Sequence, residues 1–193
     1  MQGEFMSSTR IWQRTWPLIP VRAAENQWPM ALAMVVLTAL AAQIRIPLPF
    51  TPVPITLQVL VVLAAGYLLK PWVAAGSMAL YLGLGAAGAP MFSGGLAGLS
   101  GFSGGYLLAF PLAAAVVSLL AGGTGHAGRR LGAGLAGLVI IHLAGAAWLA
   151  LVFPGATPGL TGLLTMSFLP FMAVDLAKLG VAEWLTRPPS FAS

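Results

Sequence analysis

Apolar residues in this chain form six long stretches, separated by short segments that contain proline, glycine or charged residues. The stretches approach the roughly 20 apolar residues that an α-helix needs to cross a bilayer. The pattern therefore predicts six membrane-spanning helices. We place them at residues 28–44, 55–69, 72–89, 105–121, 131–153 and 165–185.

The composition favours a membrane protein over a soluble one. Of the 193 residues, 59% are hydrophobic and only 7% are charged, whereas roughly 25% of an ordinary soluble domain is charged. So few polar side chains could not cover the surface of a soluble fold, but lipid can surround such an exterior. We expect an all-α membrane protein with one six-helix domain at 28–187. A cytoplasmic or interfacial segment, 1–27, precedes this domain, and a short tail, 188–193, follows it.

The basic residues predict the orientation in the membrane. The chain has nine Lys and Arg against four Asp and Glu. One side of the six-helix arrangement carries Arg10, Arg14, Arg22, Lys70, Arg129, Arg130 and Arg187, and the other side carries Arg45. Since cytoplasmic loops carry the excess of Lys and Arg, both termini are predicted to be cytoplasmic. Nucleic-acid binding is not expected, because these residues lie at the ends of apolar stretches rather than on one polar face.

Two loops on the predicted outer side have distinctive compositions. The loop "RIPLPFTPVPIT" contains four prolines, which favour an extended segment. The loop "MFSGGLAGLSGFSGG" is rich in glycine and serine, so its backbone can approach a ligand closely or move over it. We therefore expect both loops to cover a ligand site.

Asp175 and Lys178 lie in the middle of the last apolar stretch, roughly 13 to 15 Å of helix from its ends. An ionised residue at this depth costs on the order of 3 kcal/mol. Their spacing of three puts both on one helical face, where each offsets part of the other's desolvation. The pair could simply hold helices together. Because intramembrane ionisable groups are usually functional, we favour the polar end of a buried ligand pocket.

Further candidates for this pocket lie on other helices. Tyr81 and Tyr106 could stack on a flat ring and donate hydrogen bonds, although ordinary helix packing would explain them equally well. Gln58 could contribute one amide hydrogen bond. His142 is also near mid-membrane, and for it we expect a bond to a neighbouring backbone carbonyl instead.

Candidates in the loops have a different role. Phe92, Gly94 and Gly95 begin the glycine-rich loop and could close over a ligand, or belong to a plain connection. Arg45 could attract a carboxylate to the outer mouth of the pocket, or simply mark the membrane edge.

Several kinds of catalysis are disfavoured. The absence of cysteine excludes disulfides, thiolate catalysis and zinc–thiolate sites. "GLSG" fits the pattern of intramembrane serine proteases, with Ser100 as nucleophile and His142 as base, but glycine and serine are so common here that a chance match is easy. Neither Lys70 nor Lys178 lies in a glycine-rich phosphate cradle, so ATP hydrolysis would need other chains. We do not expect an enzyme.

Four segments of the chain resemble the BioY family, the biotin-binding S-components of energy-coupling-factor (ECF) transporters. They are "QIRIPLPFTPVPITLQ", "YLGLGAAGAPMFSGG", "GGYLLAFPLA" and "LPFMAVDLAKL". The resemblance implies six transmembrane helices in the bacterial cytoplasmic (inner) membrane, biotin as the transported ligand and no cofactor. It also implies that Asp175 and Lys178 bind the polar groups of biotin.

The resemblance implies partners as well: a transmembrane coupling subunit and two ATPases. In this family small residues on the first helix dock the coupling subunit, and Thr38 with Ala42 is the clearest such pair here. Two alternatives keep the same architecture: an S-component for another vitamin, or a secondary transporter that works alone.

Overall fold

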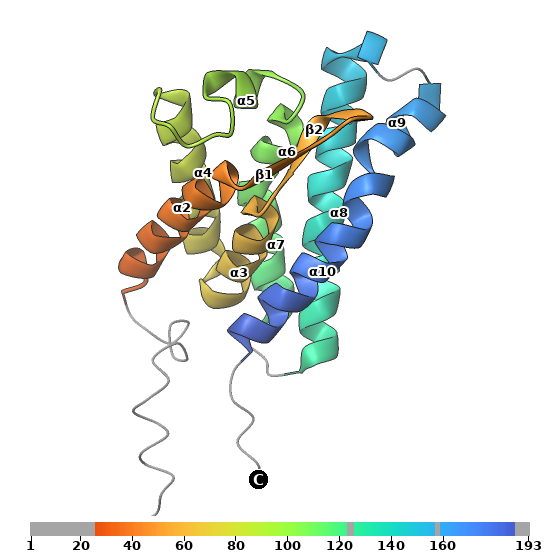
Figure 1. Ribbon diagram of the computed structural model, residues 1–193. Coiled ribbons are helices and arrows are strands. Elements are labelled where there is room, and N and C mark those ends of the chain that lie inside the picture. The colour runs from red at the N-terminus through yellow and green to blue at the C-terminus, as the bar shows by residue number, and fades with distance from the viewer. Residues whose placement is uncertain (1–25, 123–125, 157–158, 188–193) are drawn as a thin grey trace, which may run out of the picture.

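The computed structural model describes residues 26–122, 126–156 and 159–187. The described chain is mostly helical, and its long helices stand side by side as a bundle (Figure 1). These helices are α2 (Trp28–Gln43), α3 (Gln58–Leu68), α4 (Pro71–Ala86), α7 (Phe110–Ala121), α8 (Ala127–Val152) and α10 (Leu169–Thr186). Helices α2, α4, α7 and α10 each have a proline in the first turn, where its missing N–H is not needed.

Shorter elements connect these helices. They are strands β1 (Arg45–Leu48) and β2 (Thr51–Thr56), helices α5 (Leu96–Ser100), α6 (Gly104–Leu108) and α9 (Gly159–Ser167), and a 3-10 turn, η1 (Pro154–Ala156). We call the end of the bundle with β1, β2 and α5 the hairpin end (Figure 1). Helix α2 begins and α10 ends at the opposite end, the terminal end. Most of the predicted N-terminal segment and the whole predicted tail lie outside the described residues.

The predicted helices are present, but several of them differ from the prediction in their bounds or continuity. The second helix begins at Gln58 rather than residue 55, because the residues before it belong to β2. The fourth predicted helix is interrupted at Ala109, between α6 and α7. The fifth begins earlier, at Ala127, and the sixth is preceded by α9 and broken at Phe168.

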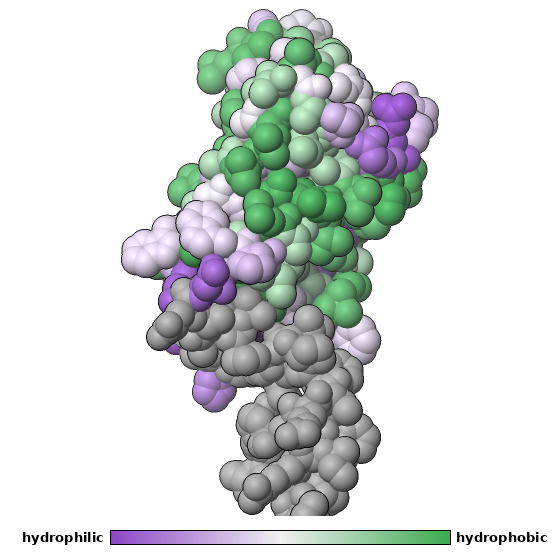
Figure 2. Space-filling model, turned by 90° about the vertical axis from the view of Figure 1, so that its left-hand side faces the viewer, coloured by the Kyte–Doolittle hydropathy of each residue, from purple (hydrophilic) through white to green (hydrophobic). Residues whose placement is uncertain are grey.

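Two stretches of the described chain are long and apolar enough to cross a membrane by themselves: Ala127–Val152 and Gly159–Thr186. Helices α2, α3 and α7 are apolar but shorter. Large apolar side chains are exposed on the outside of the bundle, including Leu32, Val36, Leu37 and Leu40 on α2. Figure 2 shows apolar side chains over much of this face, with hydrophilic side chains in smaller patches near its edges. A surface that is apolar outside as well as inside is typical of helices in lipid.

The proline-rich loop is a β-hairpin. Strand β1 pairs antiparallel with β2, so that Arg45 lies opposite Thr56 and Ile46 lies opposite Ile55. The predicted extended conformation is confirmed, but the pairing of the two halves was not predicted. Thr51, Val53 and Ile55 of β2 face the protein interior, because side chains alternate along a strand.

The last membrane stretch is broken between α9 and α10 because Pro170 has no backbone N–H. The carbonyls of Met166 and Ser167, which precede the break, bond to side chains instead. The Thr51 hydroxyl donates to the Met166 carbonyl at 2.7 Å, and the Tyr106 hydroxyl donates to the Ser167 carbonyl at 2.9 Å. These two bonds therefore tie the hairpin and α6 to the end of α9, just before α10 begins.

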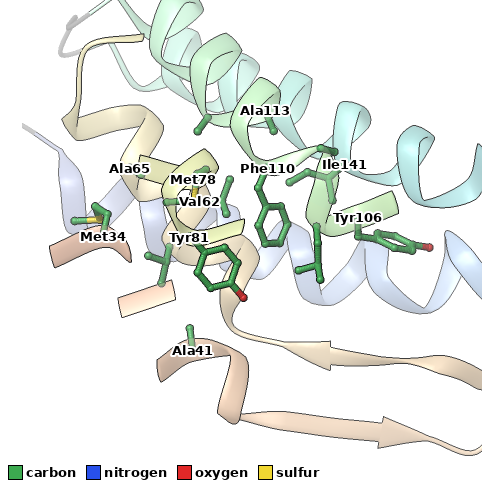
Figure 3. Close-up of a cluster of buried hydrophobic side chains, with 14 of the residues drawn as sticks. Met34, Ala41, Val62, Ala65, Met78, Tyr81, Tyr106, Phe110, Ala113 and Ile141 are labelled. Atoms are coloured by element: carbon green, nitrogen blue, oxygen red, sulfur yellow. The ribbon is translucent and has the colours of Figure 1, made fainter. Parts of the chain in front are cut away.

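The core at the centre of the bundle combines aromatic rings with small side chains (Figure 3). Tyr81 and Phe110 stack with ring centroids 6.5 Å apart. Ala65 and Ala113 are fully buried, and such small residues let helices approach closely. In the glycine-rich loop, Phe92 turns inward and fills the space that a side chain at Gly85 would need.

A charged cluster joins α8 to α10 at the terminal end. Arg130 and Glu183 are both buried, with Arg130 Nε 3.4 Å from Glu183 Oε1. Arg187 also bonds both oxygens of Glu183, at 3.0 and 2.8 Å. The Arg130 guanidinium lies 4.3 Å from the centre of the Tyr67 ring, and the Tyr67 hydroxyl donates to the Arg130 carbonyl at 2.7 Å. Arg130 thus has a structural role besides contributing positive charge to this end.

Thr38 and Ala42 do not face outward. Both side chains are fully buried, and the Thr38 hydroxyl donates to the Met34 carbonyl at 2.6 Å. Helix α2 packs against α3 and α4, so this pair lies at an internal helix contact. The prediction that it forms a docking surface for another subunit is therefore wrong.

Candidate ligand-binding site

The centre of the site is the ion pair on α10. Asp175 and Lys178 are 3% and 6% exposed, and Lys178 Nζ donates to Asp175 Oδ1 at 2.6 Å. The predicted contact between them is present, with their spacing of three placing both on one face of the helix. A carboxylate and an ammonium that are both buried stabilise each other, because each alone would carry a large desolvation cost.

His142 on α8 completes the polar group. It is 1% exposed, and its Nε2 lies 3.0 Å from Asp175 Oδ2, so the two carboxylate oxygens each have a different partner. The expected bond from His142 to a backbone carbonyl was wrong. The sequence signal was a polar residue in an apolar helix, but its partner on another helix could not be identified from spacing.

These three side chains line a cavity of about 50 Å³ near the hairpin. Strand β2, helices α3, α8 and α10, and the segment from Ser103 through α6 to Phe110 surround it. Its apolar walls include Val53, Ile55, Leu107, Phe110, Ile141 and Phe171. Its polar lining consists of Thr56, Gln58, Ser103 and Tyr106 in addition to the three side chains of the polar group. The cavity can therefore hold a small molecule with polar atoms at one end and apolar atoms elsewhere.

Tyr106 lines the cavity with its ring, while its hydroxyl is occupied by the Ser167 carbonyl. The ring lies edge-on to His142, with centroids 6.1 Å apart. It also occupies the space that a side chain at Gly145 would need, so only glycine fits there. This geometry suits the predicted ring contact with a ligand better than the predicted hydrogen bond.

Gln58 and Tyr81 form a small network beside the cavity. The Gln58 amide donates to the Tyr81 hydroxyl at 2.6 Å, and that hydroxyl donates to the Met91 carbonyl at 3.0 Å. The Gln58 carbonyl oxygen accepts from the Thr56 hydroxyl at 3.0 Å. Gln58 and Thr56 line the cavity, whereas Tyr81 lies behind Gln58 and holds it in place.

The remaining predicted residues are not part of the cavity lining. Phe92 packs edge-on against Tyr81 at 5.4 Å, one layer further out. Gly94 and Gly95, with φ of 100° and 62°, shape the loop that leads from Phe92 to α5. Arg45 is exposed at the start of β1, opposite the cavity-lining Thr56 on β2.

The serine–histidine pair of a protease is not formed in the described part of the chain. Ser100 is exposed and donates its hydroxyl to the Leu96 carbonyl at 3.2 Å. His142 is directed to Asp175 instead.

Comparisons with known proteins agree on one family. Residues 18–190 match the BioY family. The chain is 38% identical over 151 residues to the probable biotin transporter BioY of Pyrococcus horikoshii, covering 77% of this chain and 86% of that one. It is also 38% identical over 140 residues to the biotin transporter BioY of Thermotoga maritima, covering 71% and 80% of the two chains.

A solved structure has the same fold. It is the crystal structure at 2.1 Å of the S-component for biotin from an ECF-type ABC transporter, with a TM-score of 0.74 and 24% identity. The match covers 94% of this chain and 93% of that one. Because the family match spans nearly the whole chain, this protein belongs to the BioY family.

Proposed function

We propose that this protein captures biotin for uptake, as the S-component of an ECF transporter. The single observation that carries the proposal is the buried Asp175–Lys178 pair facing a cavity, in a chain that belongs to the BioY family. The curated relatives are described as biotin transporters, and the solved structure of the same fold is an S-component for biotin.

The chemistry of biotin suits the lining of this cavity. Its ureido ring offers two N–H donors and one carbonyl acceptor, which match a carboxylate and an ammonium. Its fused rings and aliphatic chain suit the walls formed by Phe110, Ile141 and Phe171. Candidate contacts are therefore Asp175 and Lys178 at the polar end and the Tyr106 ring at the side.

Binding requires the cavity to widen. Its 50 Å³ is well below the roughly 300 Å³ or more of a typical small-molecule site. The hairpin forms one wall, and the hydrogen bond from the Thr51 hydroxyl to the Met166 carbonyl links it to α9. We infer that the hairpin moves to admit biotin and that the glycine-rich loop, beginning at Phe92, Gly94 and Gly95, helps to cover it. Arg45 at the hairpin's exposed edge would attract the carboxylate of biotin.

The membrane arrangement follows from the same proposal. Six crossings place both termini on one side, in keeping with α2 beginning and α10 ending at the terminal end of the bundle (Figure 1). That end also carries Lys70, Arg130 and Arg187. Because basic residues are more frequent on the cytoplasmic side, they favour a terminal end that faces the cytoplasm from a bacterial inner membrane. The biotin site then lies towards the outer face.

Transport energy would come from partner chains. An S-component of an ECF-type ABC transporter works with a transmembrane coupling subunit and ATPases, and we propose these partners here. Since Thr38 and Ala42 are buried, the docking surface must use other residues.

Calorimetric titration of the detergent-purified protein with biotin, thiamine and riboflavin tests the proposal. We expect saturable binding of biotin, with neither of the other vitamins competing for it. Tighter binding of thiamine or riboflavin than of biotin, or no binding of biotin by the folded protein, would show that the substrate is wrong.

A further inference from the structure

His142 carries a buried polar atom for which the described part of the chain provides no partner. Its Nδ1 has no hydrogen bond, although the side chain is 1% exposed. A buried polar atom without a hydrogen bond is unfavourable, so native proteins rarely keep one without a use. The side chain belongs to the lining of the cavity, next to Asp175 and Lys178.

The surroundings of the ring leave few candidates for this bond. Tyr106, Phe168 and Phe171 lie around it, with centroids 6.1, 5.4 and 6.3 Å from that of the imidazole. The hydroxyl of Tyr106, the polar atom on these rings, already bonds the Ser167 carbonyl. A molecule in the cavity can supply the missing partner, because His142 is part of the cavity lining.

For a neutral imidazole, the contact with Asp175 determines whether this partner is a donor or an acceptor. Asp175 accepts from Lys178 through Oδ1 and faces His142 Nε2 through Oδ2. An ionised carboxylate can only accept, so the proton of a neutral imidazole is on Nε2. Nδ1 is then an acceptor, and it requires a donor from the ligand.

We propose that His142 Nδ1 accepts a hydrogen bond from one ureido N–H of biotin, and so helps select the vitamin. This inference rests on the proposed function. The ionised form of biotin has donors only on its two ureido nitrogens, so the acceptor Nδ1 can meet no other group of the ligand. Asp175 and Lys178 remain available for the other N–H and the carbonyl. His142 thereby supplies specificity for a ring with two N–H groups.

A purely structural role for His142 predicts something different. If the imidazole only holds Asp175 through Nε2, a residue that keeps an N–H at that position should support normal binding. His142→Gln places an amide near the Nε2 position, whereas His142→Asn places one near the Nδ1 position. The two variants therefore separate the two functions of the ring.

The experiment is a thermodynamic cycle between protein and ligand. Biotin and two cyclic carbamate analogues, each with one ureido N–H replaced by O, are titrated into the wild type and into His142→Gln. We expect His142→Gln to bind biotin about tenfold more weakly than the wild type. One of the two analogues should bind to the wild type and to His142→Gln with equal affinity. With this analogue the bond to Nδ1 is absent from both complexes, because the ligand lacks the N–H and the variant lacks Nδ1.

Controls keep the outcome interpretable. His126→Gln changes the other histidine of the chain, which is exposed before α8, and should bind all three ligands as the wild type does. Thermal unfolding checks that each variant is folded. If His142→Gln is not folded, His142→Asn is used in its place. Its amide lies near the Nδ1 position and keeps the bond to the ureido N–H. His142→Asn should therefore bind the analogue that lacks this N–H about tenfold more weakly than it binds biotin.

Two failures can be told apart. If the wild type does not bind biotin, the proposed function itself is wrong. If the wild type binds biotin and His142→Gln binds it with the same affinity, only the role of Nδ1 is overturned. The same holds if, for each analogue, the affinity falls below that for biotin by the same factor in the wild type and in His142→Gln.

Discussion

At the scale of single residues, the site depends on how a few side chains restrict each other. Asp175 is held by Lys178 from its own helix and by His142 from α8. Tyr106 keeps its ring beside His142 because its hydroxyl is fixed on Ser167 and the ring lies over Gly145. Substitutions that never touch a ligand should therefore disturb binding.

Gly145→Ala tests this restriction. The added methyl group would overlap the Tyr106 ring, and such overpacking costs about 1 to 3 kcal/mol. We expect a lower melting temperature and roughly tenfold weaker biotin binding, measured by thermal unfolding and calorimetry. Gly132→Ala on the same helix is the matched control, because nothing lies within 4 Å of its new methyl group. Equal biotin affinity in the two variants would contradict the role given to Tyr106.

At the scale of elements, the broken helix organises the site. Pro170 leaves the Met166 and Ser167 carbonyls without helical partners, and the hairpin and α6 supply the missing donors. The break in this helix thereby frees two carbonyls, and each makes a contact with another element. The hairpin contact is the one expected to break when a ligand exchanges.

Thr51→Val removes the hydroxyl that holds the hairpin to Met166 and keeps the shape of the side chain. The loss of the hydrogen bond to Met166, about 1 kcal/mol, should make biotin dissociate about fivefold faster, since the hairpin opens more easily. The longer bond that the same hydroxyl accepts from the Val53 N–H, at 3.3 Å, lies within the hairpin and does not hold it to α9. Release of labelled biotin into an excess of unlabelled biotin measures the rate. Thr165→Val is the control, because that exposed hydroxyl bonds only carbonyls of its own helix, α9. If both variants release biotin at the wild-type rate, the hairpin does not limit exchange.

The charged cluster at the terminal end should affect stability without affecting binding. Glu183→Gln leaves the buried Arg130 without its counter-charge, which costs roughly 3 kcal/mol or more. We expect a clearly lower melting temperature, with the biotin affinity of the folded protein unchanged because the cluster does not line the cavity. A normal melting temperature would mean that the pair does not stabilise the contact between α8 and α10.

At the scale of the whole molecule, the sequence predicted the helices and the charged pair better than the contacts between helices. Apolar stretches bounded by proline and glycine locate helices, and a spacing of three places Asp175 and Lys178 together within one helix. Hydropathy does not tell which face of a helix in lipid is internal. This is why Thr38 was expected on the outside and is buried.

Contacts between residues that are distant in the sequence were also not predicted. His142 meets Asp175 across 33 residues, and Thr51 meets Met166 across 115 residues. No local pattern specifies such pairs. The break at Phe168 did have a local signal, Pro170, which the long apolar stretch concealed.

The most direct test of the whole account neutralises the ion pair while leaving no charge unpaired. The double variant Asp175→Asn with Lys178→Gln should remain folded, because removing both partners avoids the cost of an isolated buried charge. Calorimetric titration with biotin should then show binding at least roughly hundredfold weaker than that of the wild type, since bonds to charged groups in a buried site are lost. A folded double variant that binds biotin with wild-type affinity would contradict the account.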